Sequence, residues 1–419
     1  MSETRGRHAA ATIERGTDHA ELRLSLLFAS IYAIVGVQLP FFSIWLSGRG
    51  LDALQIAAIL AVQPVIRIGS TLIASRRADR HGDHGAMLVA CAAGVAAGYA
   101  ATGLSHGFAA ILCMVALVAL AQGPIAPLAD GISFEQARRR RELGLPQMHY
   151  SWVRGWGSVS ILIFLAASGP IAGALPGEDI IWLLAGVGAL SCLWSLAALI
   201  GLRHAAPICA LRRNPPVERP GLVILLIAAA TLIQSSHSMV NAFGALHWKQ
   251  MGHSDTFVAF AWVVALATEV AAFLMAGRWF GGEARAVSFL MVGGVAAVFR
   301  WMLMSLDLNP AGIFFAQALH GASCAAVQIG PAYLLAALGG RERQAQAQAW
   351  LAAAIAGGNG LFTLLSGPLY TMMGEHAYLA MAGFAFLGTL LSFGVAKLAD
   401  EWRASTHIAT AEPQHSGAA

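Results

Sequence analysis

The sequence FVAFAWVVALATEVAAFLMAGRW, residues 257–279, is an apolar stretch that contains one carboxylate, Glu269. A helix needs about 20 apolar residues to cross a bilayer, and an ionised side chain within it is costly enough to suggest a functional position. The next two apolar stretches contain Arg300 and His320. We therefore expect three successive membrane-spanning helices to carry a site for protons and anions.

The composition agrees with a membrane protein. Hydrophobic residues make up 57% of the 419 residues and charged residues 11%, whereas soluble domains contain roughly 25% charged residues. The net charge of +4 gives no indication of nucleic-acid binding. The five cysteines form no CxxC pair and four lie in apolar stretches, so we expect neither disulfides nor a metal or other cofactor. The first 21 residues are polar, which argues against a cleaved signal peptide.

Twelve apolar segments follow one another along the chain. They predict an all-α polytopic membrane protein with twelve transmembrane helices in two pseudo-symmetric six-helix bundles. The predicted helices are Leu22–Trp45, Leu54–Ala74, Ala86–Leu104, Ala109–Ala129, Ser151–Ile171, Ile180–Leu202, Leu222–Trp248, Phe257–Arg278, Ala286–Leu306, Ala311–Leu335, Ala347–Met372 and Ala377–Leu398.

The positions of the basic residues predict the orientation. With a cytoplasmic N-terminus, 21 of the 26 basic residues lie in cytoplasmic segments, and the outside loops hold only Arg49 and Lys249. We expect a multi-pass protein of the cell (inner) membrane with both termini in the cytoplasm. Its predicted parts are an N-terminal tail (1–21), a first bundle (22–202), a basic, proline-rich central loop (203–220), a second bundle (221–398) and a C-terminal tail (399–419).

The two halves of the chain share a repeat. Anchored on the repeated spacings, Arg67 falls one residue from the equivalent of Glu269, so the halves are expected to present opposite charges at matching depth. The repeated spacings are Trp45 to Asp52 with Trp248 to Asp255, and Trp152 to Ser168 with Trp350 to Ser366.

The three charged or titratable residues of the second half suit proton coupling. A carboxylate shielded from water binds a proton readily, and an approaching guanidinium releases it, so alternation between these environments makes Glu269 a proton carrier. The alternative is a permanent structural ion pair between Glu269 and Arg300, although buried pairs seldom repay their desolvation. His320 is expected to take part in coupling or to be a hydrogen-bonded packing residue.

Four further residues are candidates for substrate binding. Arg67 lies deep in its predicted helix without an acidic partner in its own half, so it is expected to bind an anionic substrate or to pair with Glu269. Asp130 and Arg154 are predicted at similar depth and form either a pair or two snorkelling interface residues. His237 lies in the outer half of its helix and is either a site residue or a packing residue.

The loop after the second predicted helix resembles a known signature. Asp79, Arg80 and Gly82 match the acidic residue, arginine and second glycine of GxxxDRxGRR, the loop motif of the major facilitator superfamily, while Ser75 replaces the first glycine. The resemblance implies that this loop helps to lock the cytoplasmic face during transport. The alternative interpretation is a tight basic turn.

A narrower resemblance covers nearly the whole chain. The sequence is similar to the phenylpropionic acid permease group, which is related to oligosaccharide/proton symporters of the lactose permease type. The resemblance implies substrate binding by Asp130 and Arg154 and proton coupling by Glu269, Arg300 and His320. One departure is Ser323, which replaces the second carboxylate of the sugar symporters and leaves Glu269 as the expected proton carrier. The similar segments are 38–50, 67–70, 127–130 and 153–158, with His237, Glu269, Arg300, Trp301, His320 and Gly321.

These observations predict a secondary active transporter and not an enzyme. The resemblance implies proton-coupled uptake of a small organic solute, an aromatic monocarboxylate such as 3-phenylpropionate, by alternating access. Uptake of sugars or nucleosides, proton-antiport drug export and ligand sensing without transport are the alternatives. The expected partners are the substrate, protons and the lipid bilayer, for a protein that acts as a monomer. No HExxH, GxSxG or Cys/His ligand spacing supports an enzyme.

Overall fold

The computed structural model describes residues 20–200, 219–279, 285–338 and 341–411. All regular secondary structure in these residues is helical. Most of the predicted N-terminal tail, most of the central loop and the end of the C-terminal tail lie outside the described residues.

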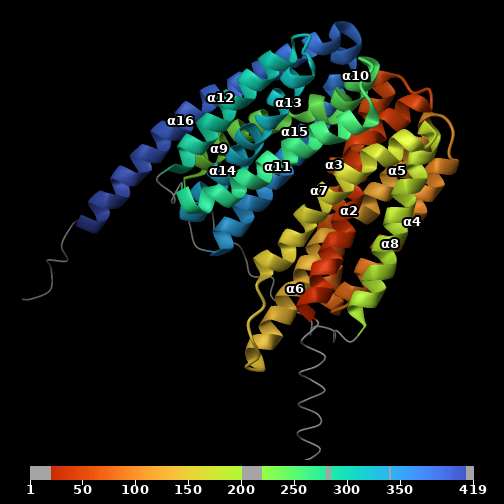
Figure 1. Cartoon of the computed structure of the whole chain (residues 1–419). Helices are drawn as coiled ribbons and strands as arrows, with labels where there is room; N and C mark the ends of the chain where they lie inside the picture. Colours follow the sequence, from red (N-terminus) through yellow and green to blue (C-terminus); the bar gives the residue numbers. More distant parts are fainter. Residues whose placement is uncertain (1–19, 201–218, 280–284, 339–340, 412–419) are drawn as a thin grey trace, which may run out of the picture. The chain divides into compact units, whose positions relative to one another are not determined.

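The described part of the first half of the chain forms seven α-helices (Figure 1). Asp52 caps α3 through its side chain, and Gly82 ends that helix in the left-handed conformation. The helices are α2 (Ala20–Gly48), α3 (Ala53–His81), α4 (His84–Leu104), α5 (Phe108–Gln122), α6 (Ile125–Glu142), α7 (Tyr150–Ala174) and α8 (Ile180–Leu199), with the short 3-10 helix η1 (Gly177–Asp179) before α8.

The second half contains eight α-helices and two π-helical segments among the described residues. The two long helices α15 and α16 are separated by the 3-10 helix η5 (Gly374–Ala377). The others are α9 (Pro220–Ser235), π-helix η2 (Val240–Gly244), α10 (Ala245–Gln250), α11 (Asp255–Trp279), α12 (Ala286–Met304), α13 (Pro310–Ala318), π-helix η4 (Gly321–Ala325), α14 (Ala326–Ala337), α15 (Arg341–Met373) and α16 (Tyr378–Ala411).

Eleven segments of the described chain are long and apolar enough to cross a membrane. The last of them, Gln346–Ala404, has 59 residues, about twice the length that one crossing requires. It covers most of α15 and α16, which part at Gly374, where φ is +56°. The segments therefore correspond to the twelve predicted helices. Helix α16 continues beyond the predicted end at Leu398.

Three predicted helices are interrupted. The fourth divides into α5 and α6 at Gly123 and Pro124, where proline supplies no backbone N–H. The seventh breaks after Ser235, and the tenth breaks after Ala318. His237 and His320 lie at these last two breaks, each followed by a π-helical segment. The sequence did not predict the breaks at the two histidines, and π-segments frequently accompany functional sites.

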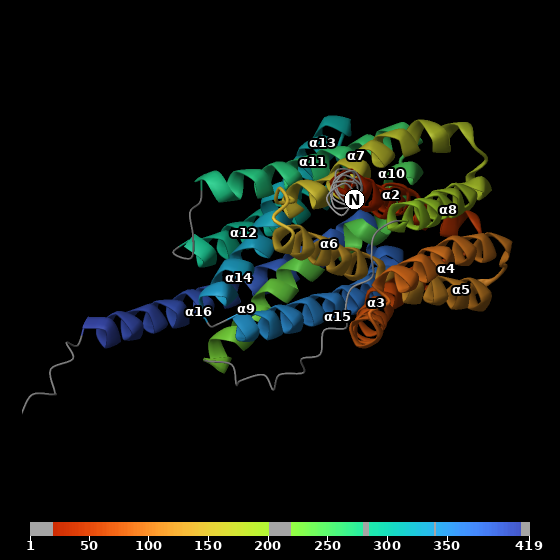
Figure 2. The ribbon, with the colours of Figure 1, turned by 90° about the horizontal axis from the view of Figure 1, so that it is seen from below.

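The described chain divides into two compact units. One comprises Met1–Arg212, Ser238–Val264 and Gly360–Met372, and the other comprises Arg213–His237, Ala265–Asn359 and Met373–Ala419. In the first unit α2 packs along α7, and α4 packs between α5 and α8. In the second unit α16 lies beside α12 and α9 (Figures 1 and 2). The predicted boundaries of the two six-helix bundles stay a prediction.

The sequence repeat recurs in the packing of the first unit. A Cβ added to Gly169 would lie 2.9 Å from Cα of Thr256, and one added to Gly367 would lie 3.1 Å from Cα of Leu54. Both glycines belong to a Ser-Gly-Pro sequence, and each packs on the first turn of a helix that follows a repeated tryptophan. The two halves of the chain therefore use the same glycine contact.

Candidate functional site

Glu269 of α11 is held by side chains of residues 320–328. Its Oε2 lies 3.3 Å from Nε2 of His320, and its Oε1 accepts hydrogen bonds from Nε2 of Gln328 (2.9 Å) and Sγ of Cys324 (3.5 Å). The side chains of Glu269 and His320 are 17% and 6% exposed. Because these groups can all donate to the carboxylate, the arrangement suits an ionised glutamate.

Arg300 lies on the other side of His320 and is fully buried. Its Nη1 is 2.8 Å from Nδ1 of His320, and its Nη2 donates to Oε1 of Gln317 at 2.6 Å. A guanidinium only donates, so Nδ1 of His320 must accept and Nε2 must carry the proton that points at Glu269. Arg300 therefore fixes the tautomer of His320, and the histidine links Arg300 to Glu269.

His237 completes this cluster from the break after α9. Its Nδ1 lies 3.2 Å from the carbonyl oxygen of Ile233, and its Nε2 lies 3.1 Å from Oγ of Ser323. The ring packs edge-on against Trp301, with centroids 4.8 Å apart. His237 is thus a buried member of the cluster that contains His320 and Arg300.

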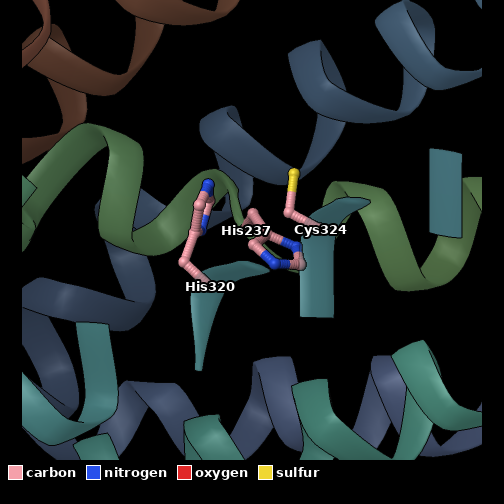
Figure 3. Close-up of side chains that lie close together, drawn as sticks. All are labelled: His237, His320 and Cys324. Atoms are coloured by element: carbon pink, nitrogen blue, oxygen red, sulfur yellow. The ribbon is translucent and has the colours of Figure 1, made fainter. Parts of the chain in front are cut away.

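Three side chains of this cluster offer metal-ligand atoms. Atoms of His237, His320 and Cys324 lie within 4.8 Å of one another (Figure 3). However, Arg300 and Glu269 engage both ring nitrogens of His320, and a bound cation would lie beside the buried guanidinium. We interpret the group as a hydrogen-bonded network and not as a metal site.

Gly321 allows the two chain segments of the site to approach each other. A Cβ at this position would lie 2.6 Å from the carbonyl carbon of Thr268 and 3.1 Å from N of Glu269. Both are backbone atoms, which cannot rotate away. The glycine that follows His320 is therefore required for the contact between His320 and Glu269.

We expect Gly321→Ala to lower stability by roughly 1–3 kcal/mol, because the added methyl group must separate two packed backbones. The matched control is Gly357→Ala, where an added Cβ meets nothing within 4 Å. Thermal unfolding of both purified variants measures the difference. Equal melting temperatures for the two variants would contradict the close-packing argument.

Arg67 occupies a second polar cluster, in the first unit. Its Nη2 donates to Oε1 of Gln122 (2.7 Å) and to Oε1 of Gln63 (3.0 Å). Nε2 of Gln38 donates to Oε1 of Gln63 (3.0 Å), and Nε2 of Gln122 donates to Oε1 of Gln38 (3.4 Å). No ion pair among the described residues includes Arg67. Its partners are neutral amides, and Glu269 belongs to the other unit.

Asp130 and Arg154 come together, as the sequence suggested. Nε of Arg154 lies 3.9 Å from Oδ1 of Asp130, which also accepts a hydrogen bond from the hydroxyl of Tyr150 at 2.8 Å. Nη2 of Arg154 donates to the hydroxyl of Tyr32 at 2.5 Å, and the guanidinium lies over the rings of Tyr32 and Phe28. Both charged side chains are about one-third exposed. The cluster combines an ion pair with aromatic surface.

The residues of the predicted gating loop form the last turn of helix α3 and its C-cap. Arg80 is exposed in the last turn. Gly82 has φ of +70°, and its N–H bonds to the carbonyl oxygen of Ala78 at 2.8 Å. This backbone conformation explains the glycine of the motif. The side chain of Asp79 lies outside the described part of the structure.

The sequence interpretation missed the amide and hydroxyl groups that hold the charged residues. Each such group lies in an otherwise apolar helix, where a polar side chain needs a partner. A polar side chain within an apolar helix was therefore the sequence signal that could have identified these residues. The missed residues are Gln63, Gln122, Gln317 and Gln328, together with the thiol of Cys324 and the hydroxyls of Tyr32 and Tyr150.

Comparisons with known proteins agree with this architecture. A sequence profile of the MFS_1 like family matches residues 21–380. The Probable 3-phenylpropionic acid transporter of Escherichia coli (strain K12) is 25% identical over 366 residues, which cover 86% of this chain and 93% of that protein. This similarity confirms the predicted resemblance to the phenylpropionic acid permease group.

Solved structures show the same fold. The nucleoside transporter NupG gives a TM-score of 0.75 at 15% identity, covering 90% of this chain and 99% of that structure. The peptide transporter POT in complex with sulfate gives 0.72 at 13% identity, covering 92% and 94%. The predicted all-α polytopic membrane fold is confirmed.

Proposed function

The chain belongs to the MFS_1 like family and is a membrane transporter rather than an enzyme, and from this premise we propose proton-coupled uptake of an aromatic monocarboxylate such as 3-phenylpropionate. The single observation that carries the proton-coupling part is the buried connection from Arg300 through His320 to Glu269. Glu269 is the proposed proton carrier, and Arg300 and His320 control its surroundings.

Proton binding changes the contact between α11 and residues 320–328. An ionised Glu269 accepts charge-assisted hydrogen bonds from His320 and Gln328, and such bonds are roughly twice as strong as neutral ones. A protonated Glu269 is a weaker acceptor and places its O–H against one of these donors. Protonation therefore weakens the contact between α11 and the segment that carries His320. The proton thus favours a conformation in which the two segments are apart over one in which they are in contact.

We expect Arg300→Gln to uncouple proton movement from solute movement. Without the guanidinium, the ring proton of His320 can move from Nε2 to Nδ1. Nε2 can then accept a hydrogen bond from a protonated Glu269, so α11 stays in contact with His320. Coupling free energies are typically 1–3 kcal/mol, so solute accumulation should fall roughly 5- to 150-fold while downhill flux persists. The collapse of an imposed pH gradient in proteoliposomes without solute measures the resulting leak.

The matched control for this leak is Arg76→Gln, which removes an exposed arginine at the end of α3. It should hold the pH gradient as the wild type does. Full coupling in the Arg300→Gln variant would show that the histidine tautomer has no part in transport.

Two features support a carboxylate as the solute. Arg67 is a guanidinium whose described partners are neutral amides, and an anion is its natural counter-ion. The cluster of Asp130 and Arg154 adds the aromatic side chains Tyr32 and Phe28, which suit a ring-bearing solute. The name of the Escherichia coli relative, a probable 3-phenylpropionic acid transporter, supports the same class.

The proposal includes the cellular location of the protein and the orientation of its chain in the membrane. The distribution of basic residues supports a cell (inner) membrane protein with both termini in the cytoplasm. The motif residues Asp79, Arg80 and Gly82 support a gating loop on the cytoplasmic face. We propose that the protein works as a monomer.

A thermal-shift screen of the purified protein tests the solute class. We expect aromatic monocarboxylates to raise the melting temperature in a concentration-dependent way, because a ligand that binds the folded state stabilises it. Sugars and nucleosides form the comparison set. Stabilisation by a nucleoside or sugar but by no carboxylate would overturn the proposed substrate.

A further inference from the structure

The clusters around Arg67 and Glu269 share one plan. Each charged residue lies on the second predicted membrane-spanning helix of its half, and Glu269 follows Arg67 by 202 residues. Gln122 and Gly123 lie in the fourth predicted helix, and His320 and Gly321 follow them by 198 residues. The same offset of 198 relates Trp152 to Trp350, so the correspondence follows the repeat of the chain.

The glycine contact is the same in both clusters. A Cβ on Gly123 would lie 2.6 Å from the carbonyl oxygen of Arg67 and 2.9 Å from its Cα. A Cβ on Gly321 would lie 3.1 Å from N of Glu269. In each half a glycine at a helix break therefore packs on the backbone at the charged residue, against the carbonyl oxygen and Cα of Arg67 in the first half and against the peptide bond between Thr268 and Glu269 in the second. The residue before that glycine, Gln122 or His320, contacts the charged side chain.

The polarity of the two contacts is opposite. His320 donates a hydrogen bond to the carboxylate of Glu269, whereas Gln122 accepts one from the guanidinium of Arg67. An arginine cannot accept, so the amide oxygens of Gln122 and Gln63 must face it. Those oxygens satisfy only Nη2.

Two buried polar groups of this cluster have no partner among the described residues. One is Nε of Arg67, and the other is the hydroxyl of Tyr99, whose side chain is 1% exposed. Tyr99 packs edge-on against Phe42, one turn after Gln38 on α2, so it lies beside the amides that hold Arg67. An arginine Nε–H can only donate and a tyrosine hydroxyl can donate. A ligand that satisfies both must therefore be an acceptor.

We propose that Arg67 and Tyr99 bind the carboxylate of the solute, and that Gln122 is the positioning residue that holds Arg67, as His320 holds Glu269. This inference rests on the proposed function and adds the groups that select the solute. The amide partners bring no charge of their own, so one guanidinium faces one negative charge. The site accordingly selects monocarboxylates, and the two halves hold the solute and the proton on one repeated framework.

Gln122→Glu in the full-length protein tests the proposal. The new carboxylate keeps the acceptor toward Arg67 but neutralises the guanidinium, as a permanently bound solute would. We expect the affinity for 3-phenylpropionate to fall roughly tenfold or more, with unchanged affinity for the neutral 3-phenylpropionamide and undiminished thermal stability. Gln55→Glu makes the same substitution at a half-buried position in the first turn of α3, where the carboxylate keeps the acceptor for the N–H of Asp52. It is the matched control and should leave both affinities unchanged.

Tyr99→Phe gives a second test that keeps the ring packing against Phe42. It should weaken binding of the carboxylate several-fold and leave the amide unaffected. Unchanged carboxylate affinity in Gln122→Glu, or equal losses for acid and amide, would overturn the inference. If the wild type binds the acid but does not transport it, the proposed function fails and the carboxylate site stands. A wild type that binds no carboxylate would overturn both.

Discussion

Glu269→Gln should abolish uphill uptake while solute exchange continues. In proteoliposomes with an inward proton gradient, the wild type is expected to accumulate solute and the variant only to equilibrate it. The physical reason is that glutamine resembles a permanently protonated glutamate, so it can neither release a proton nor restore the strong contact with His320. Entrance counterflow of labelled solute, which needs no net proton movement, measures the exchange that remains.

The control for this variant is Glu142→Gln, which removes an exposed carboxylate at the end of α6. It should accumulate solute as the wild type does. Loss of counterflow together with loss of binding in Glu269→Gln would place Glu269 in the solute site or in the structural framework instead. Retained uphill uptake would exclude Glu269 as the proton carrier.

Arg67→Lys should lower kcat/KM for carboxylate uptake by roughly 10- to 100-fold, the equivalent of about 1.4–2.7 kcal/mol. Lysine keeps the positive charge but is a point charge on a flexible stem, so it loses the planar fork that binds both oxygens of a carboxylate. The change should appear mainly in KM, because the proton site around Glu269 is untouched. Initial rates of uptake across a range of solute concentrations separate KM from kcat.

Arg76→Lys provides the matched control, since it makes the same substitution at an exposed position of the same helix. Its kinetics should equal those of the wild type. Binding of the neutral 3-phenylpropionamide adds a second comparison, because it should be insensitive to the substitution at Arg67. A fall in kcat with no change in KM would argue that Arg67 serves the conformational cycle and not the solute.

The charged residues of the site were predictable because apolar helices make them conspicuous. Glu269, Arg300 and His320 each interrupt a membrane-spanning stretch, and desolvation forces such groups to find partners. They do meet, with His237 beside them. The alternative of a direct ion pair between Glu269 and Arg300 does not describe this site, since His320 lies between the two.

The glutamines were harder to predict. An amide costs far less than a charge in an apolar surrounding, so Gln63, Gln122 and Gln328 do not stand out from their helices. Which of them faces a charged side chain depends on how the helices are rotated and packed. Hydropathy contains no information on that rotation.

The helix breaks at His237 and His320 also escaped prediction, for local reasons. The break near His237 contains no proline. Its cause is a competition for the carbonyl oxygen of Ile233, which accepts from Oγ of Ser236 (2.6 Å) and lies 3.2 Å from Nδ1 of His237. Side chains that bond to nearby carbonyl groups compete with the helical hydrogen bonds, and a sequence pattern does not show that they will do so.

The most direct test of proton coupling is uptake of labelled 3-phenylpropionate into proteoliposomes with and without an inward proton gradient. Protein-free liposomes set the baseline, because the neutral form of a weak acid crosses lipid unaided and accumulates in an alkaline interior. We predict protein-dependent accumulation above this baseline that disappears when a protonophore collapses the gradient. A protein-dependent flux of equal size with and without the gradient would contradict proton-coupled uptake.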